Sequence, residues 1–484
     1  MGRLSGLLLA GLAVVALVGC GSSKPGSGGA SSPTVQALSY FPTTSPFVIT
    51  AATNPKAAAV KQLQQQSPSY ALAATALFAK LSSLGIDYNA DIRPLFGNPV
   101  VAGAVSTPGF TGGSSSTDFL VVWVTKSASK LSSLISKLHL TRTGTHDGAT
   151  LYSAGQAGLA TSGATVFLAR SPTVLDAALD RHAHNQGFDA AAYATATAGV
   201  PANGLVTAFG NLAPLLSAPG AANARQIPWV GAISRYSASM TSSQNQVKIT
   251  YHVATNGKSL SVSQLPIASG TSSPGIAGAA PIGLGIRDPE QIINFIADAI
   301  QRTDPAQWAK ATKQAAALQK RSGVDIASLG KLLTGQLNLA SDTHTTIARA
   351  QLSDPSAMQA ALAKLARAGN IKGARLIPLG GGLYHVHSKS PDKADVTMGV
   401  IDGQMVLGKA SPAQLRVFAA APASTTSAGT GAVTFRIAIA GLLQTLKHQP
   451  SPMAMRLLGM IGDITGSAQA DTDGLSGTIS VPIK

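Results

Sequence analysis

Alternating apolar and polar residues mark several segments of this 484-residue chain as β-strands. The stretches "DFLVVWVT" from Asp118 and "NQVKITYHV" from Asn245 alternate most clearly, and we expect half-buried antiparallel strands there. Helical periodicity follows pairs of strands, and Ser171-Pro172 has the N-cap Ser and first-turn Pro of a helix start. Similar starts precede other predicted helices, at Asn54, Asp288 and Ser411. Strand pairs with helices between them predict an α+β fold with mostly antiparallel sheets.

The predicted elements occur twice in the same order. "PFVITAATNP" from Pro46 corresponds to "PIGLGIRDPE" from Pro281, and "GIDYNADIRPLFGNPVVAG" from Gly85 corresponds to "GVDIASLGKLLTGQLNLAS" from Gly323. Each copy is expected to read strand, long helix, two strands, helix, two strands, helix, strand, helix and closing hairpin. Seven matches in sequence predict one internal duplication, with each copy long enough to bury its own core.

This duplication, the start of the chain and a Pro/Gly/Ser-rich segment define the expected domain organisation. We predict two tandem repeats behind an export signal and a flexible tether, with a second linker between the repeats. The expected segments are a signal peptide at 1–19, an acylated cysteine and tether at 20–36, repeat 1 at 37–264, a linker at 265–280 and repeat 2 at 281–484.

The N-terminal segment has the layout of a secretory signal. It starts with Arg3, continues with apolar residues from Leu7 to Val18 and ends in small residues. It is too short to span a bilayer, which takes about 20 residues. The single cysteine, Cys20, ends the tetrapeptide Leu17-Val18-Gly19-Cys20, which resembles the lipobox of bacterial lipoproteins. The resemblance implies cleavage before Cys20 and a diacylglycerol (palmitate-type) anchor on its sulfur, hence a location on the extracytoplasmic face of the cell membrane.

Composition restricts the partners and the chemistry. A formal net charge of +16 favours anionic partners such as anionic lipid or wall polymer. Nucleic acid is not expected, because aromatic residues make up 5% of the chain and no basic-aromatic motif occurs. Glu290 is the only glutamate, which excludes paired-Glu glycosidase sites and the helical His-Glu zinc motif.

Two stretches carry a resemblance to a known family. They are "LSYFPTTSPFVITAATNP" from Leu38 and "GIDYNADIRPLFGNPVVAGAV" from Gly85. The body of the chain resembles the domain-of-unknown-function family DUF3352, found in actinobacterial envelope proteins. Leu95 stands where that family usually has Trp, and the positions that fit its pattern are Gly85, Asp87, Asp91, Pro94 and Gly97. The resemblance implies an envelope location and a fold, and it brings no activity.

Histidine pairs are the first candidates for chemistry. His385 and His387 alternate on a predicted strand, so both can face one metal ion. Neither a third ligand nor a matching pair in repeat 1 is evident, and we expect solvated strand histidines rather than a metal site. His182 and His184 end a predicted helix, where imidazoles complement the exposed carbonyl groups.

The acidic candidates are better explained by a structural role than by catalysis. Asp87 and Asp91 have the spacing of a carboxylate pair for acid/base chemistry. We expect them instead to cap backbone N–H groups, with Arg93 neutralising one of them. Repeat 2 keeps only Asp325.

Two further motifs are incomplete. "GQMVLGKA" from Gly403 lacks the Ser/Thr of a phosphate-binding loop and is expected to form a hairpin turn and a strand. Ser127-x-x-Lys130 and Ser328-x-x-Lys331 have the spacing of a Ser-Lys acyl enzyme but lack its companion motifs.

We therefore expect a membrane-anchored extracytoplasmic lipoprotein that is not an enzyme and needs no cofactor. It is expected to bind or scaffold a partner at the cell envelope, with Cys20 as the lipidation site. A carrier of a lipid or another apolar ligand is the alternative, and a closed apolar cavity above about 300 Å³ between sheet and helices would favour it. An exported metal-dependent hydrolase using His385 and His387 is the third possibility.

Overall fold

The computed structural model describes most of the chain after residue 31. The described residues are 32–53, 81–83, 85–106, 118–243, 245–256, 260–342, 345–369, 374–388, 396–424, 430–445, 451, 455 and 458–483. They form two compact units. Unit 1 comprises the described residues up to Ala222 together with Ile233–Ala254, and unit 2 comprises Asn223–Ala232 and the described residues of Thr255–Pro482.

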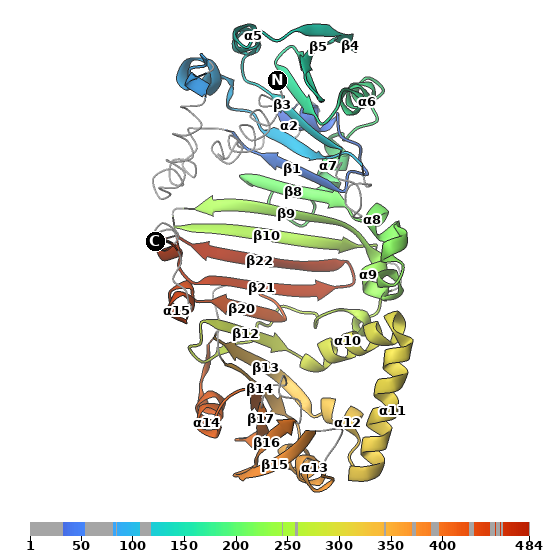
Figure 1. Cartoon of the computed structure of the whole chain (residues 1–484), viewed down its shortest axis with the longest axis vertical. Coiled ribbons are helices and arrows are strands. Elements are labelled where there is room, and N and C mark those ends of the chain that lie inside the picture. Colours follow the sequence, from blue (N-terminus) through green and yellow to red (C-terminus); the bar gives the residue numbers. More distant parts are fainter. Residues whose placement is uncertain are drawn as a thin grey trace. The chain divides into compact units, whose positions relative to one another are not determined.

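Ten described strands build the sheet of unit 1 (Figure 1). They are β1 (Phe47–Ala51), β2 (Val100–Ala104), β3 (Phe119–Val124), β4 (Arg142–His146), β5 (Ala149–Ala154), β6 (Ala157–Ser162), β7 (Thr165–Ala169), β8 (Val206–Asn211), β9 (Ile233–Ser243) and β10 (Gln246–Thr255). Their order in space is β4-β5-β6-β7-β3-β2-β1-β8-β9-β10, and the pairings from β4 to β9 are antiparallel.

Helices cover the sheet of unit 1 on both faces. They are α2 (Pro33–Leu38), η1 (Tyr88–Ile92), η2 (Arg93–Leu95), α5 (Ala128–Lys137), α6 (Pro172–Ala183), α7 (Ala190–Ala196), α8 (Ala213–Ser217) and η3 (Pro219–Ala221). Strand β3 shows the arrangement, because Leu120 and Val122 join one core with α2 and α6, whereas Val121 and Trp123 join another with α5. Alternate residues of β3 therefore point into two different cores, and both faces of the strand are buried. The prediction of a half-buried strand there is wrong. A central strand between two helical layers has no solvent face.

Unit 2 contains ten further described strands (Figure 1). They are β12 (Ile282–Arg287), β13 (Leu333–Ser341), β14 (Thr346–Leu352), β15 (Ala374–Gly380), β16 (Leu383–Ser388), β17 (Val396–Ile401), β18 (Gln404–Gly408), β20 (Val433–Ile437), β21 (Ile464–Asp471) and β22 (Gly474–Pro482). The order is β15-β16-β17-β18-β14-β13-β12-β20-β21-β22, with antiparallel neighbours throughout.

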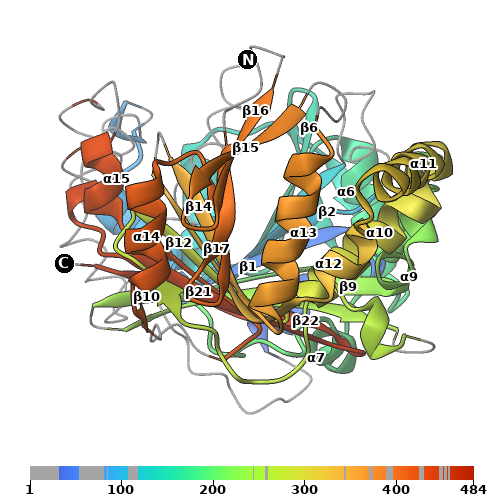
Figure 2. The same ribbon diagram turned by 90° about the horizontal axis from the view of Figure 1, so that it is seen from below.

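The helices of unit 2 also occupy both faces, as Figure 2 shows for α13 and α14. The described elements are η4 (Ala224–Gln226), α9 (Pro228–Ala232), η5 (Val262–Gln264), α10 (Pro289–Thr303), α11 (Pro305–Ser322), α12 (Ile326–Gly330), α13 (Pro355–Arg367), α14 (Pro412–Ala420) and α15 (Ile439–Thr445). Met358 and Leu362 of α13 pack in one core, and Leu415 of α14 packs in another. A two-stranded sheet pairs β11 (Ile276–Ala277) with β19 (Ala423–Ser424).

The two units have the same strand order when β1 to β10 are matched with β12 to β18 and β20 to β22. In both, the hairpin β9/β10 or β21/β22 closes the sheet where the sequence pattern predicts it. These observations and the antiparallel pairings confirm the α+β class, whereas the duplication itself stays a prediction.

The order of elements differs from the expected pattern between α5 and α6, and again between α13 and α14. Two strands were predicted in each interval, and four are present. Strand β4 is an edge strand with no fully buried residue, so its sequence lacks the apolar alternation that would reveal it. Asp288 also differs from expectation, because its side chain makes no capping bond to α10, whereas Ser171 and Ser411 cap α6 and α14 as predicted.

Described structure extends into both segments predicted as flexible. Helix α2 begins at Pro33 inside the expected tether, with Ser32 as its N-cap, and continues into predicted repeat 1, where Leu38 is fully buried. In the expected linker at 265–280, Leu265 and Ile276 are fully buried in unit 2. Gly, Pro and Ser residues are frequent in both segments, so their composition predicted linkers, although a helix begins in the first segment and apolar residues of the second are packed.

Candidate functional site

An open apolar pocket of about 370 Å³ lies beside α14 in unit 2. Its floor contains Ala340 of β13 and Phe418 of α14, which form a small buried cluster with Ala277. The lining residues are almost all small or apolar: Gly278, Ala279, Ala280, Ala340, Ser341, Thr345, Ile347, Ala413, Gln414, Val417, Phe418 and Ala421. A pocket of this size and character suits part of an apolar molecule.

The matched face of unit 1 is filled by large side chains. Phe41, Phe167 and Phe209 are fully buried there, and Tyr40 packs edge-on against Phe167 with 4.7 Å between ring centroids. Burial raises the pKa of Tyr40 to about 12. In unit 2 the segments that face α14 carry alanine and glycine in place of these large side chains. The matched position in unit 2 is therefore an open pocket rather than a filled core.

A buried arginine stands behind the pocket floor. Arg349 of β14 is 7% exposed, and its Nη1 donates to the carbonyl oxygens of Phe418 and Ala419 at 2.8 and 2.6 Å. Its guanidinium also lies over the Phe418 ring, 5.4 Å from the centroid. Burial lowers the pKa of Arg349. The positive end of the side chain thus binds the C-terminal carbonyls of α14 and fixes Phe418 in place.

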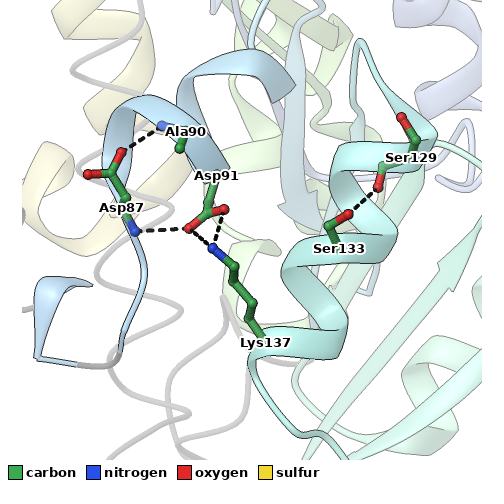
Figure 3. Close-up of polar contacts among 6 residues, drawn as sticks. All are labelled: Asp87, Ala90, Asp91, Ser129, Ser133 and Lys137. Atoms are coloured by element: carbon green, nitrogen blue, oxygen red, sulfur yellow. Dashed lines mark hydrogen bonds and ion pairs between the residues drawn. The ribbon is translucent and has the colours of Figure 1, made fainter.

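Figure 3 shows that Asp87 and Asp91 are both engaged by neighbouring donors. Asp87 accepts from the Ala90 backbone N–H at 2.7 Å and caps η1. Asp91 is buried and accepts from the Asp87 backbone N–H at 2.9 Å and from Lys137 Nζ at 2.7 and 2.8 Å. The Lys137 hydrogen bond, followed by the Asp87 N–H, holds the pKa of Asp91 below its usual range.

This geometry confirms the capping role of Asp87 and corrects the partner of Asp91. Lys137 at the end of α5, rather than Arg93, forms the ion pair with Asp91. The prediction failed because Lys137 is distant in sequence and reaches η1 only through the packing of α5. Asp325 caps α12 through the Ala327 N–H at 3.0 Å, so it too serves a helix start.

The histidines at the end of α6 interact with nearby chain segments. His184 Nδ1 lies 2.7 Å from the Asp180 carbonyl oxygen, which confirms the expected complement to the helix end. His182 Nδ1 lies 2.7 Å from Ser39 Oγ, and its ring stacks on Tyr40 with 4.3 Å between centroids. Burial lowers the pKa of His182. His182 therefore secures the N-terminal segment to α6.

His385 and His387 lie on β16 with ring centroids 6.3 Å apart. Within the described ranges, they belong to no group of three metal-ligating side chains. The only such group found there is His146, Asp147 and Asp180, which sequence analysis missed.

The missed group lies at the surface between a hairpin turn and α6. His146 Nε2 is 2.7 Å from Asp180 Oδ1 and 3.6 Å from Asp147 Oδ2. Its hydrogen bond to Asp180 raises the pKa of His146 and lowers that of Asp180. His146 and Asp180 are 34 positions apart, and no turn or helix motif relates residues at that separation. A local sequence motif therefore could not have predicted this pair.

The remaining motifs have structural roles. Asp402-Gly403 forms the turn between β17 and β18, which confirms the expected hairpin in place of a phosphate loop. Ser127 caps α5 by accepting from the Lys130 N–H at 3.3 Å, and Ser328 donates to the Asp325 carbonyl at 2.7 Å. Cys20 lies outside the described residues, so its lipidation stays a prediction. None of the helices that the structure describes combines the length and apolar character needed to cross a bilayer.

These observations define an α+β protein with two similar sheet units and an apolar pocket in the second. A model of the family described as "Protein of unknown function (DUF3352)" matches residues 4–368. The chain therefore belongs to this family, which confirms the resemblance seen in the sequence. No curated protein matches the chain.

Solved structures add a weak likeness. Crystal form III of TP0453 has 8% sequence identity, a TM-score of 0.27 and coverage of 46% of this chain and 82% of its own. Crystal form IV has 10% identity, a TM-score of 0.24 and coverage of 46% and 81%. At these TM-scores the likeness supports no conclusion about fold or function.

Proposed function

We propose that this chain is a lipid-anchored extracytoplasmic protein that binds a partner at the cell envelope and does not catalyse a reaction. The observation that carries the proposal is the position of the single cysteine, at the end of Leu17-Val18-Gly19-Cys20 and behind an apolar segment. A diacylglycerol group on Cys20 supplies two acyl chains, which is the number that stable anchoring requires.

The tether supports the same proposal. The Gly/Ser/Pro-rich residues between Cys20 and Ser32 separate the acylation site from α2, the first described helix. Linkers of this composition let a folded body reach partners near the membrane.

The test is phase partitioning of the full chain after expression in a bacterium that processes lipoproteins. Wild type is expected in the detergent phase, and Cys20→Ser is expected in the aqueous phase or retained as an uncleaved precursor. Ser22→Ala is the matched control, because it alters a neighbouring residue without removing the thiol. Equal partitioning of wild type and Cys20→Ser, with both chains cleaved to the same size on gel electrophoresis, would overturn the anchor.

The pocket beside α14 favours a more specific second candidate, a carrier of a lipid or another apolar ligand. Its volume exceeds the roughly 300 Å³ at which small-molecule sites begin. Polar atoms at the rim are few and are already engaged, since Gln414 Oε1 accepts from the Ser411 N–H at 2.9 Å. The pocket is open, so it does not meet the expectation of a closed cavity, and it suits one chain of a molecule whose head remains in water.

Binding of N-phenyl-1-naphthylamine, an uncharged apolar probe, tests this candidate. We expect saturable fluorescence enhancement with one site per chain, and weaker binding when Val417→Asp places a charge on the pocket wall. Leu379→Asp, at an exposed apolar position of β15, is the control. Non-saturable enhancement, or equal binding by both variants, counts against a carrier.

A further inference from the structure

A patch of exposed apolar side chains lies on α10 and η5 in unit 2. Ile293 and Ile296 of α10 are 42% and 51% exposed, and Val262 of η5 is 57% exposed. Gln291 of α10 holds η5 against the helix, because its Nε2 donates to the carbonyl oxygens of Val262 and Leu265 at 3.0 and 2.6 Å. We call Val262, Ile293 and Ile296 the α10 patch.

The pattern of α10 explains why the patch forms. Ile292, Ile293, Ile296 and Ile300 recur at helical spacing and make one apolar stripe, while Asp298 and Arg302 pair on another face at 2.7 Å. A surface helix normally buries such a stripe against its own protein. In α10 only Pro289 is buried, so part of the stripe remains open.

Helix α11 adds positive charge beside this patch. It follows α10 after the single residue Asp304 and contacts it, as Figures 1 and 2 both show, and none of its 18 residues is buried. The helix contains no Asp or Glu, and Lys310, Lys313 and Lys320 fall within one arc of its circumference. In the described part of the chain no ion pair neutralises these three lysines.

We propose that the α10 patch and the lysines of α11 form a docking surface for an anionic lipid bilayer. Apolar side chains beside a basic helical face are the features by which helices lie in a membrane interface. The apolar residues enter the boundary between headgroups and acyl chains, and the lysines bind anionic headgroups. The lack of acidic residues on α11 favours this occupant, because every charged side chain of the helix complements an anionic bilayer.

This inference rests on the proposed location at the membrane, since it gives the anchored chain a second contact with the bilayer. It is independent of acylation itself. A chain that lacks Cys20 therefore tests docking separately from lipidation.

The test uses the absence of any other cysteine in the chain. In the full chain carrying Cys20→Ser, the substitution Ile293→Cys provides one attachment point for a nitrobenzoxadiazole fluorophore, whose emission reports local contact with lipid. Vesicles of phosphatidylcholine with 30% phosphatidylglycerol serve as the anionic bilayer, at roughly the charge density that attracts basic segments. Pure phosphatidylcholine vesicles are the neutral comparison. Leu379→Cys, on exposed β15 of the same unit, is the matched control position.

We expect a blue shift and a gain in emission for the label at 293 with anionic vesicles, and neither change at 379. In the labelled background, Lys310→Gln with Lys313→Gln is expected to weaken vesicle binding about 25-fold, or about fivefold per lysine. No change at 293 would overturn the proposal. An equal change at both positions would also overturn it, because it would mean that the body contacts lipid without using the α10 patch.

Discussion

Filling the floor of the unit 2 pocket distinguishes an accessible cavity from a packed core. Ala340→Leu adds three carbons at a buried position that lines the pocket. A pocket of about 370 Å³ has room for them, since one water molecule occupies about 30 Å³ in the liquid. Each newly buried methylene contributes about 0.8 kcal/mol, which sets an upper limit of about 2 kcal/mol of added stability.

The same substitution in a filled core has the opposite sign. Ala160 is fully buried in the core of unit 1, beside large aromatic side chains. Ala160→Leu must displace those neighbours and is expected to cost about 1–3 kcal/mol. The pair of variants therefore separates pocket from core by the sign of the change in unfolding free energy.

Urea unfolding followed by far-ultraviolet circular dichroism measures both variants, and titration with N-phenyl-1-naphthylamine follows on the folded proteins. We expect Ala340→Leu to be neutral or up to about 2 kcal/mol more stable, with the probe bound at least tenfold more weakly. A loss of more than about 1 kcal/mol would refute the reasoning, because it would show that the space around Ala340 is already occupied. Unchanged probe affinity would place the probe elsewhere.

Three further outcomes follow from the polar and aromatic contacts. NMR titration should give His146 a pKa above the usual value of about 6.5, and Asp180→Asn should return the pKa of His146 toward that value. The ion pair therefore stabilises the fold below about pH 6.5, and this stabilisation is lost as the pH rises through the His146 pKa. Because the pKa of Asp91 is depressed, Asp91→Asn should lower the urea midpoint at pH 6, and the difference from wild type should shrink as pH falls below about 4; a constant difference down to pH 2 would contradict this. Phe41→Ala should cost about 3–5 kcal/mol by emptying the unit 1 core, and a loss below 1 kcal/mol would mean that the core collapses around it.

Sequence periodicity was sufficient for the α+β class and for the closing hairpins, because long alternating segments such as β10 and β22 carry their own signal. It failed at β4, where edge residues are exposed and need no alternation. It also predicted one solvent-exposed face for β3, whereas both faces are buried. A pattern of apolar residues does not show whether helices cover one face of a strand or both.

The contacts of the candidate sites were less predictable than the elements. Local capping by Asp87 and Ser171 follows from spacing within one turn, and the sequence predicted it. The Lys137 partner of Asp91 and the His146–Asp180 pair join residues more than 30 positions apart, so only the fold brings them together. The pocket is a further case, because it arises from small residues on separate elements rather than from any motif.

The central claim is that a diacylglycerol group on Cys20 anchors this chain to the membrane. Mass spectrometry of the N-terminal peptide from the membrane fraction of wild-type cells tests it most directly. The account predicts a peptide that begins at Cys20 and carries the mass of diacylglycerol, and a loss of that modification in Cys20→Ser. An unmodified thiol at Cys20, or a mature chain that begins at another residue, would contradict it.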